Sequence, residues 1–228
     1  MRAKHYGPLA RMEPDENIEK IGANSDPVKQ NGYSVTPGGN KRRRILKAPK
    51  YLTTEEITAF FKVITDLRDR ALFRTIYHRG LRAHEPGRLR LSDFHARDGR
   101  LLVARGKGST GGEYRLCDEE LRSLRAYVRY VRGVSAGPLF LSRNGRALGR
   151  VQIWRLMQRY CKAAGIDPQK AHPHALKHSC GTHLAERGED LLEIQDHMGH
   201  KNAANTRIYI DTTNKKRDAR GDRLKDWK

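Results

Sequence analysis

The sequence has few cysteines and no long apolar run, and both absences exclude classes of protein. The three cysteines, Cys117, Cys161 and Cys180, are odd in number and widely spaced, which predicts neither a disulfide framework nor a zinc ribbon. No apolar stretch is long enough to span a bilayer, no basic amphipathic helix stands out, and the N-terminus carries charges where a signal peptide needs an apolar core. The sequence therefore predicts a protein of the reducing cytoplasm that binds no membrane.

Acidic residues are scarce relative to basic ones. In 228 residues the chain has 46 lysines and arginines against 26 aspartates and glutamates, which gives a formal net charge of +20. This excess is spread along the chain and is larger than solubility requires. The charge therefore indicates a protein that binds nucleic acid.

The first part of the chain differs in composition from the rest. Residues 1–47 hold four prolines and paired glycines but few periodic apolar positions, so we interpret them as an extended or disordered arm. The arm ends in a basic run that has two open interpretations, a solvated tail or a flexible arm that contacts DNA phosphates. The residues of this run are Lys41, Arg42, Arg43 and Arg44.

Residues 48–210 have the patterns of an ordered domain. Thr53 and Glu56 form a capping box ahead of apolar residues at helical spacing, which predicts a first helix there. The same periodicity predicts helices over 69–77, 118–132 and 149–164. Two segments joined by the glycine-rich loop GKGSTGG have the composition of short strands, at 101–105 and 113–116. The sequence thus predicts an α+β fold that is mainly α-helical, with a small antiparallel β-hairpin.

Titratable side chains are concentrated near the end of this domain. His174, Lys177 and His178 are spaced by three and four residues, so they share one face if the segment is helical. Glycine stops and a capping box farther along predict three short helices folded back on each other. Such folding would bring His174, Lys177, His200 and Tyr209 into one pocket that suits work on a phosphate.

These motifs resemble those of the tyrosine recombinases, also called phage-type integrases. The elements HALKH at 174–178, MGH at 198–200 and TRIY at 206–209 match, in order and spacing, the second half of the family's active site. Residues 80–94 match the family element that holds Arg82 and Glu85, with His84 in place of the usual serine. The glycine-rich loop matches the family's hairpin, which presents a catalytic lysine, here Lys107.

The resemblance implies a role for each matching residue. Tyr209 would attack a DNA phosphodiester and become joined to the 3′ phosphate, while Arg82 holds two phosphate oxygens and Lys107 protonates the departing 5′ oxygen. His174 would act as base or donor, and His200 would donate a hydrogen bond to the phosphate. Glu85 would orient a cation of the pocket. No metal or other cofactor is implied, because side-chain cations surround the phosphate.

Lys177 departs from the family pattern, which has arginine at this position. Lysine keeps the positive charge but loses the bidentate fork, so we expect slower cleavage. A catalytically weakened or inactive DNA-binding relative on the same fold therefore stays an alternative. Two more alternatives are a zinc site at His174 and His178, and nicking and closing of DNA in the manner of type IB topoisomerases.

The resemblance also implies partners and missing parts. Family members act as four protomers around two DNA duplexes, and a terminal segment often docks on a neighbouring subunit, which is the role expected for the charged tail at 211–228. Arg143 and Arg146 lie in a predicted loop and are candidates for contacts with DNA phosphates. The alternative is that this loop is only solvated. The family's separate core-binding domain is not expected within residues 1–47, so the sequence predicts a reduced relative or a fragment.

Overall fold

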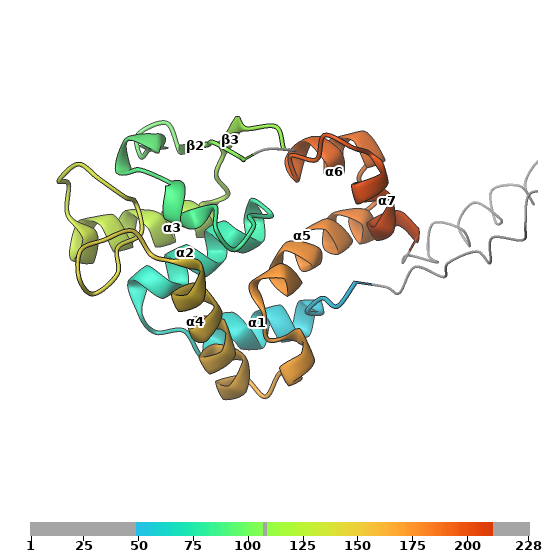
Figure 1. Cartoon of the computed structure of the whole chain (residues 1–228), viewed down its shortest axis with the longest axis horizontal. Coiled ribbons are helices and arrows are strands. Elements are labelled where there is room, and N and C mark those ends of the chain that lie inside the picture. The colour runs from blue at the N-terminus through green and yellow to red at the C-terminus, as the bar shows by residue number, and fades with distance from the viewer. Residues whose placement is uncertain (1–48, 107–108, 212–228) are drawn as a thin grey trace, which may run out of the picture. The chain divides into compact units, whose positions relative to one another are not determined.

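The structure, a computed structural model, describes residues 49–106 and 109–211 (Figure 1). These residues belong to one compact unit that is mainly helical, and none of its helices is long and apolar enough to cross a membrane. The α-helices described are α1 Thr54–Lys62, α2 Leu67–His78, α3 Asp118–Tyr127, α4 Arg150–Ala163, α5 Pro173–Arg187, α6 Leu191–His197 and α7 Ala204–Asp211. The strands described are β1 Phe94–His95, β2 Arg100–Val103 and β3 Gly112–Arg115.

Helix α1 begins at the capping box that the sequence predicts. The Thr53 hydroxyl accepts a hydrogen bond from the Glu56 amide at 3.3 Å, and the Glu56 carboxylate accepts one from the Thr53 amide at 2.8 Å. These two bonds satisfy amides that have no partner inside the helix. The helix buries Ile57, Phe60 and Phe61 against the rest of the domain.

The main core lies where α2 packs against α3 and α5 (Figure 1). The rings of Phe60, Phe73 and Tyr160 meet edge to face, with centroids 5.2 to 6.3 Å apart. Burial of each large apolar side chain contributes about 1.5–3 kcal/mol, and such edge-to-face pairs add to that. This core fixes α2, which leads into the turn that holds Arg82, and α5, which holds Lys177.

A second apolar cluster joins the last three helices. It consists of Cys180, Ala185, Ile194, Met198 and Tyr209. Helix α5 ends where the sequence places a glycine stop, and α6 begins at the capping box expected after it. The three helices at the end of the domain are therefore confirmed.

The small sheet is antiparallel, in the order β1-β2-β3. Strands β2 and β3 pair in register from Arg100 with Arg115 to Val103 with Gly112, so the hairpin is confirmed with each strand starting one residue earlier than expected. The two-residue strand β1 was not predicted, because so short a segment has no alternation to detect.

The expected continuous helix over 118–132 is wrong in its last third. Helix α3 ends at Tyr127, and Val128–Arg132 form a π-helical turn closed by the bond from the Gly133 amide to the Val128 carbonyl at 2.9 Å. Gly133 has φ +71°, a left-handed conformation that glycine adopts without strain. Apolar spacing does not distinguish the two helix types over a single turn.

Candidate active site

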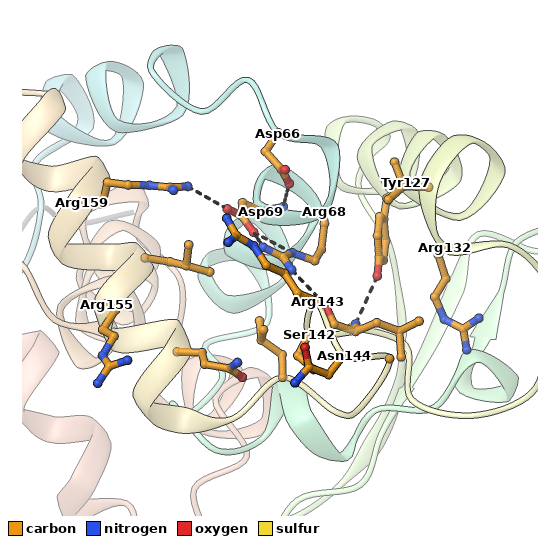
Figure 2. A pocket seen from close by; sticks show the side chains of 16 residues that line it. Asp66, Arg68, Asp69, Tyr127, Arg132, Ser142, Arg143, Asn144, Arg155 and Arg159 are labelled. Carbon is orange, nitrogen blue, oxygen red and sulfur yellow. Dashed lines mark hydrogen bonds and ion pairs between the residues drawn. The ribbon is translucent and has the colours of Figure 1, made fainter.

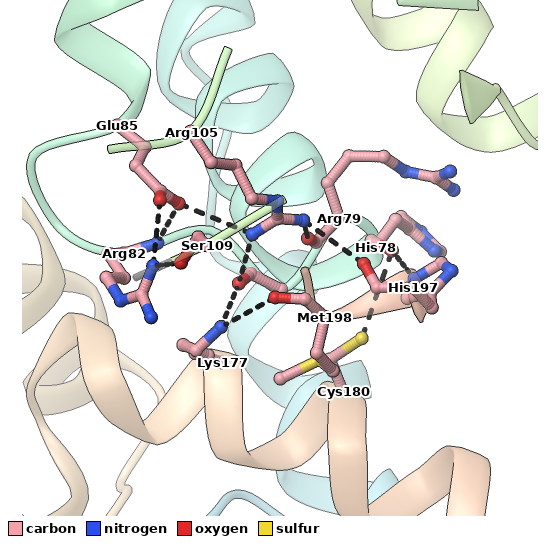
Figure 3. Close-up of polar contacts among 11 residues, drawn as sticks. His78, Arg79, Arg82, Glu85, Arg105, Ser109, Lys177, Cys180, His197 and Met198 are labelled. Atoms are coloured by element: carbon pink, nitrogen blue, oxygen red, sulfur yellow. Dashed lines mark hydrogen bonds and ion pairs between the residues drawn. The ribbon is translucent and has the colours of Figure 1, made fainter. Parts of the chain in front are cut away.

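Arg82 lies in the turn that follows α2, beside Glu85. The Arg82 amide donates to one Glu85 carboxylate oxygen at 2.7 Å, and Nη1 of Arg82 donates to the other at 3.2 Å (Figure 3). Nη1 also donates to the Ser109 hydroxyl. Glu85 is 1% exposed, whereas the Arg82 side chain is 25% exposed. The buried carboxylate thus orients a guanidinium that still reaches solvent and can therefore bind an anionic group.

Lys177 projects from α5 toward the same turn. Its Nζ donates to the Gly80 carbonyl at 2.7 Å and to the Met198 carbonyl at 3.5 Å (Figure 3). Burial, and then the positive charges of Arg105 and Arg82, lower the pKa of Lys177 to about 7. The ammonium group is therefore held by main-chain oxygens and titrates near neutral pH.

His200 follows the turn at the end of α6. Its Nδ1 lies 3.0 Å from the Thr206 hydroxyl, and its carbonyl accepts a bond from Gln195 at 2.9 Å. Burial, followed by the charges of Lys177 and Arg82, lowers the pKa of His200 to about 4. The imidazole is thus neutral at pH 7, and when Thr206 donates to Nδ1 the ring carries its proton on Nε2.

Tyr209 lies in α7 and packs its ring against α5. Its hydroxyl is 3.1 Å from Nδ1 of His178, and its ring is nearly parallel to that of His200, with centroids 6.3 Å apart. The side chain is 1% exposed, and burial raises the pKa of Tyr209 above its usual value. The hydroxyl is therefore shielded from solvent in this packing.

A close approach at Gly181 makes room for the tyrosine ring. A Cβ atom at this position would lie 2.6 Å from Cε2 of Tyr209, well inside van der Waals contact. Glycine is therefore required in this part of α5 for α7 to pack as it does.

Gly181→Ala is expected to push the Tyr209 ring out of its place and loosen α7. The overpacking should cost about 1–3 kcal/mol of local stability. Hydrogen exchange of the amides of 204–211 should become faster. Thr182→Ala, which adds no atoms at the neighbouring position, serves as the control and should leave the exchange of α7 unchanged. Unchanged exchange in Gly181→Ala would contradict the packing described.

Arg105 is an active-site neighbour that the sequence analysis missed. Its side chain is fully buried, and Nη2 donates to the carbonyls of Arg79 at 2.7 Å and His197 at 3.1 Å. Nη1 lies 3.4 Å from the Gly80 carbonyl and 3.5 Å from the Glu85 carboxylate. The available signal was a charged residue that ends an apolar strand segment immediately before the glycine-rich loop.

A known protein family matches most of this chain. Residues 50–216 match the phage integrase family, and this match covers well over half of the chain. The chain belongs to the phage integrase family. The expected family resemblance and the expected mainly helical fold with a small antiparallel sheet are thus confirmed.

Relatives of this integrase-family chain include tyrosine recombinases of bacteria and archaea. The tyrosine recombinase XerD of Xanthomonas axonopodis pv. citri is 36% identical over 177 residues, which cover 71% of this chain and 58% of XerD. XerA of Pyrococcus furiosus is 35% identical over 173 residues, which cover 73% of this chain and 59% of XerA. The chain therefore spans somewhat less than three fifths of each of these relatives.

Solved structures of the family have the same fold. The crystal structure of XerA recombinase superposes with a TM-score of 0.66 at 25% identity, over 75% of this chain and 62% of that one. A XerH recombinase bound to its difH DNA substrate before cleavage superposes with a TM-score of 0.63 at 27% identity, over 76% of this chain and 53% of that one. The structural likeness thus includes a family member that has been seen on DNA.

The structure brings together part of the residue set expected for a family member. Arg82, Glu85 and Lys177 meet around the turn after α2, and His200 lies beside Tyr209. His174 is exposed near the start of α5, one turn ahead of Lys177 and His178. The sequence analysis gave His178 no role except as a possible zinc ligand, but its ring contacts the candidate nucleophile.

The residues predicted to contact DNA lie either outside the described residues or away from the candidate active site. Lys107 and the basic run 41–44 lie outside the residues that the structure describes. Arg143 and Arg146 are exposed in the loop ahead of α4, and Arg143 lines a cavity of about 830 Å³ (Figure 2). Other arginines line this cavity as well, namely Arg68, Arg132, Arg155 and Arg159. The cavity contains none of the expected catalytic residues, so it is a separate basic surface.

The alternative of a zinc site gains no support from the geometry. Across the ranges 49–106 and 109–211, no group of three or more histidine, cysteine, aspartate or glutamate side chains is placed to hold a metal ion. His178 lies beside Tyr209 at 3.1 Å, and His183 lies beside Tyr77 at 2.8 Å. Both are hydrogen-bonded parts of the helix packing.

Proposed function

We propose that this chain is the catalytic part of a site-specific DNA recombinase that cleaves and rejoins DNA strands through a 3′-phosphotyrosyl intermediate. Residues 48–210 would form the catalytic domain. The arm 1–47 would contact DNA and the tail 211–228 would dock on a neighbouring subunit. Double-stranded DNA is the proposed substrate, and four copies around two duplexes form the proposed assembly.

One observation carries this proposal: two cations and a neutral imidazole, from three separate segments, lie in the region of a buried tyrosine. Arg82 comes from the turn after α2, Lys177 from α5 and His200 from the turn after α6. The charges of Lys177 and Arg82 both lower the pKa of His200. The charge of Arg82 also lowers the pKa of Tyr209, whereas burial raises it. Glu85 balances part of this positive charge, and a phosphodiester would supply a further anion.

The proposed reaction is an exchange of phosphate esters. The Tyr209 oxygen forms a bond to phosphorus, the bond from phosphorus to the 5′ oxygen breaks, and the 5′ oxygen leaves as a hydroxyl. Lys107 supplies the proton of that hydroxyl, and the phenol proton passes to a neutral imidazole. His178 is placed to accept it in the packed arrangement, and His174 is the acceptor that the family resemblance implies.

The cations act on the phosphate rather than on the tyrosine alone. Arg82 and the Nε2 proton of the neutral His200 would contact its non-bridging oxygens, and Lys177 would add a second positive charge. Each such preorganised donor is worth roughly 10²–10³-fold in rate. The proposed reaction uses these side chains in place of a metal ion, and it needs no high-energy cofactor because the two esters are of similar energy.

A trapping assay tests the proposal. DNA fragments retained by the full chain are first sequenced to define its site, and a duplex of that site is then nicked so that a short 5′-hydroxyl fragment diffuses away after cleavage. Protein joined covalently to the 3′ end, stable in denaturing gel, is the expected result. Retention of DNA without any covalent product would favour the weakened, DNA-binding relative that Lys177 keeps as an alternative. Strand exchange between two sites would separate a recombinase from a type IB topoisomerase.

The trapping rate is expected to fall as pH rises above about 7. Lys177 has a pKa lowered to about 7, so it is charged below that pH and neutral above it. Deprotonation removes one positive charge from beside the phosphate, and the second-order rate constant reports this titration in the free protein. The measurement is the trapping rate at limiting DNA between about pH 6 and pH 9.

Lys177→Arg is the control for this pH profile. Arginine stays charged throughout the range, so its profile should lack the decrease near pH 7 at whatever absolute rate it has. The same decrease in both proteins would assign it to another group.

A further inference from the structure

We propose that Arg105 is a positioning residue of this active site. It holds the turn that carries Arg82 and the turn that carries His200 at a fixed separation, and it orients the ammonium group of Lys177. This inference rests on the proposed function, since it concerns the geometry of the same site. Arg105 lies in the loop that follows β2, and its side chain reaches the carbonyls at the ends of α2 and α6 (Figure 3).

The first contact set of Arg105 joins two turns that are far apart in sequence. One guanidinium nitrogen, Nη2, donates both to the Arg79 carbonyl at the end of α2 and to the His197 carbonyl at the end of α6. The two carbonyls are separated by more than a hundred residues of chain, and each lies three residues before a candidate catalytic side chain, Arg82 or His200. A single planar group therefore sets the separation of these two turns.

The second contact is electrostatic. Glu85 is buried, and its carboxylate is shared between Arg82 at 3.2 Å and Arg105 at 3.5 Å. A buried carboxylate with one guanidinium on each side is fixed in orientation, and it fixes Arg82 in turn. Removal of the Arg105 charge leaves Glu85 to Arg82 alone, so Arg82 would be drawn toward the carboxylate rather than toward a phosphate.

The third contact concerns Lys177. Its Nζ shares the Gly80 carbonyl with Nη1 of Arg105, at 2.7 and 3.4 Å, and it also reaches the Met198 carbonyl, next to the one that Arg105 holds. An ammonium group has no rigid fork and cannot by itself fix two turns. Arg105 supplies that planar fork from a different segment, which explains how the site keeps its form with lysine at position 177.

Close packing at Gly199 shows that Arg105 belongs to this arrangement. A Cβ atom on Gly199 would lie 2.4 Å from Cδ and 2.5 Å from Nε of Arg105. The Gly199 carbonyl also accepts a bond from the Thr110 amide at 3.1 Å, so the loop that contains Arg105 pairs with the turn before His200. The glycine of the MGH motif thus leaves the space that the arginine side chain occupies.

Two substitutions separate the contributions of Arg105. Arg105→Met keeps a long side chain without charge or fork, and Arg105→Lys keeps the charge alone. Arg70→Met is the matched control, because Arg70 also donates to main-chain carbonyls, those of Ile64 at 2.9 Å and Phe61 at 3.3 Å, but lies outside the site. All three are compared with wild-type protein by thermal unfolding, DNA retention and the trapping rate of the full chain.

Arg105→Met is expected to trap DNA about 10²-fold more slowly, since small misplacement of catalytic groups has effects of this order. Arg105→Lys should lose about 10-fold, and Arg70→Met should trap at the wild-type rate even if it unfolds at a lower temperature.

The pH profile provides a readout that a purely structural role would not change. The positive charge of Arg105 is one cause of the low pKa of Lys177, so the decrease in rate near pH 7 should move to higher pH in Arg105→Met and stay in place in Arg105→Lys. Neither variant changes the other titratable and charged groups that interact electrostatically with Lys177. These groups are Arg82, Glu85, Cys180, His174, His178 and His200.

The outcomes are distinguishable. Wild-type rates in folded Arg105→Met or Arg105→Lys would overturn the inference, as would equal losses in both with no shift of the pH profile. If Arg105→Met does not fold, the loss in Arg105→Lys decides alone. Absence of trapping by the wild-type protein would count against the proposed function itself.

Discussion

Tyr209→Phe should abolish the covalent protein–DNA complex, with a loss on the order of 10⁴-fold or more in trapping rate, because the variant has no nucleophilic oxygen. The ring, its packing over Gly181 and its parallel contact with His200 are retained. Of the contacts described for Tyr209, the substitution removes the one between its hydroxyl and His178. Thermal stability and DNA retention should therefore change little.

Tyr130→Phe is the matched control for this experiment. Tyr130 is 69% exposed, on the π-helical turn after α3, and has no part in the site. It should give wild-type amounts of covalent complex on the same nicked duplex. A covalent complex of undiminished yield in Tyr209→Phe would assign the nucleophile to another residue.

Arg82→Lys is expected to have the second largest effect, a decrease of about 10²–10³-fold in trapping rate. Lysine preserves one positive charge beside the buried Glu85 but cannot bind the carboxylate, Ser109 and two phosphate oxygens at once. Arg82→Ala is less informative, because it leaves the buried carboxylate with Arg105 as its single ion-pair partner among the described residues and destabilises the turn.

The control for Arg82→Lys is Arg97→Lys, at an exposed position between β1 and β2. It makes the same chemical change away from the site and should leave trapping unaltered. DNA retention should be similar in wild-type protein and in both variants, since overall charge is conserved. A wild-type trapping rate in Arg82→Lys would show that the fork of Arg82 does not contact the reacting phosphate.

Local signals in the sequence were sufficient for the elements that end at a cap or a glycine. The capping boxes at Thr53 and Asp190 and the left-handed glycine at Gly188 all lie where sequence patterns place them. Caps and glycine stops satisfy backbone groups within a few residues, so their signal is contained in a short window. The π-helical turn at 128–132 and the strand β1 have no comparable local signal, and neither was predicted.

Sequence by itself determined the family of this protein and its helical domain with a small hairpin, because motif order and spacing match those of the family. The same motifs led to the proposal of Arg82, Lys177, His200 and Tyr209 as site residues. Only the tertiary structure decided that Arg105 holds the turns of the site and that His178 lies against the tyrosine. Their partners are carbonyl oxygens and side chains from distant segments. Contacts of that kind depend on how helices pack, and no local spacing encodes them.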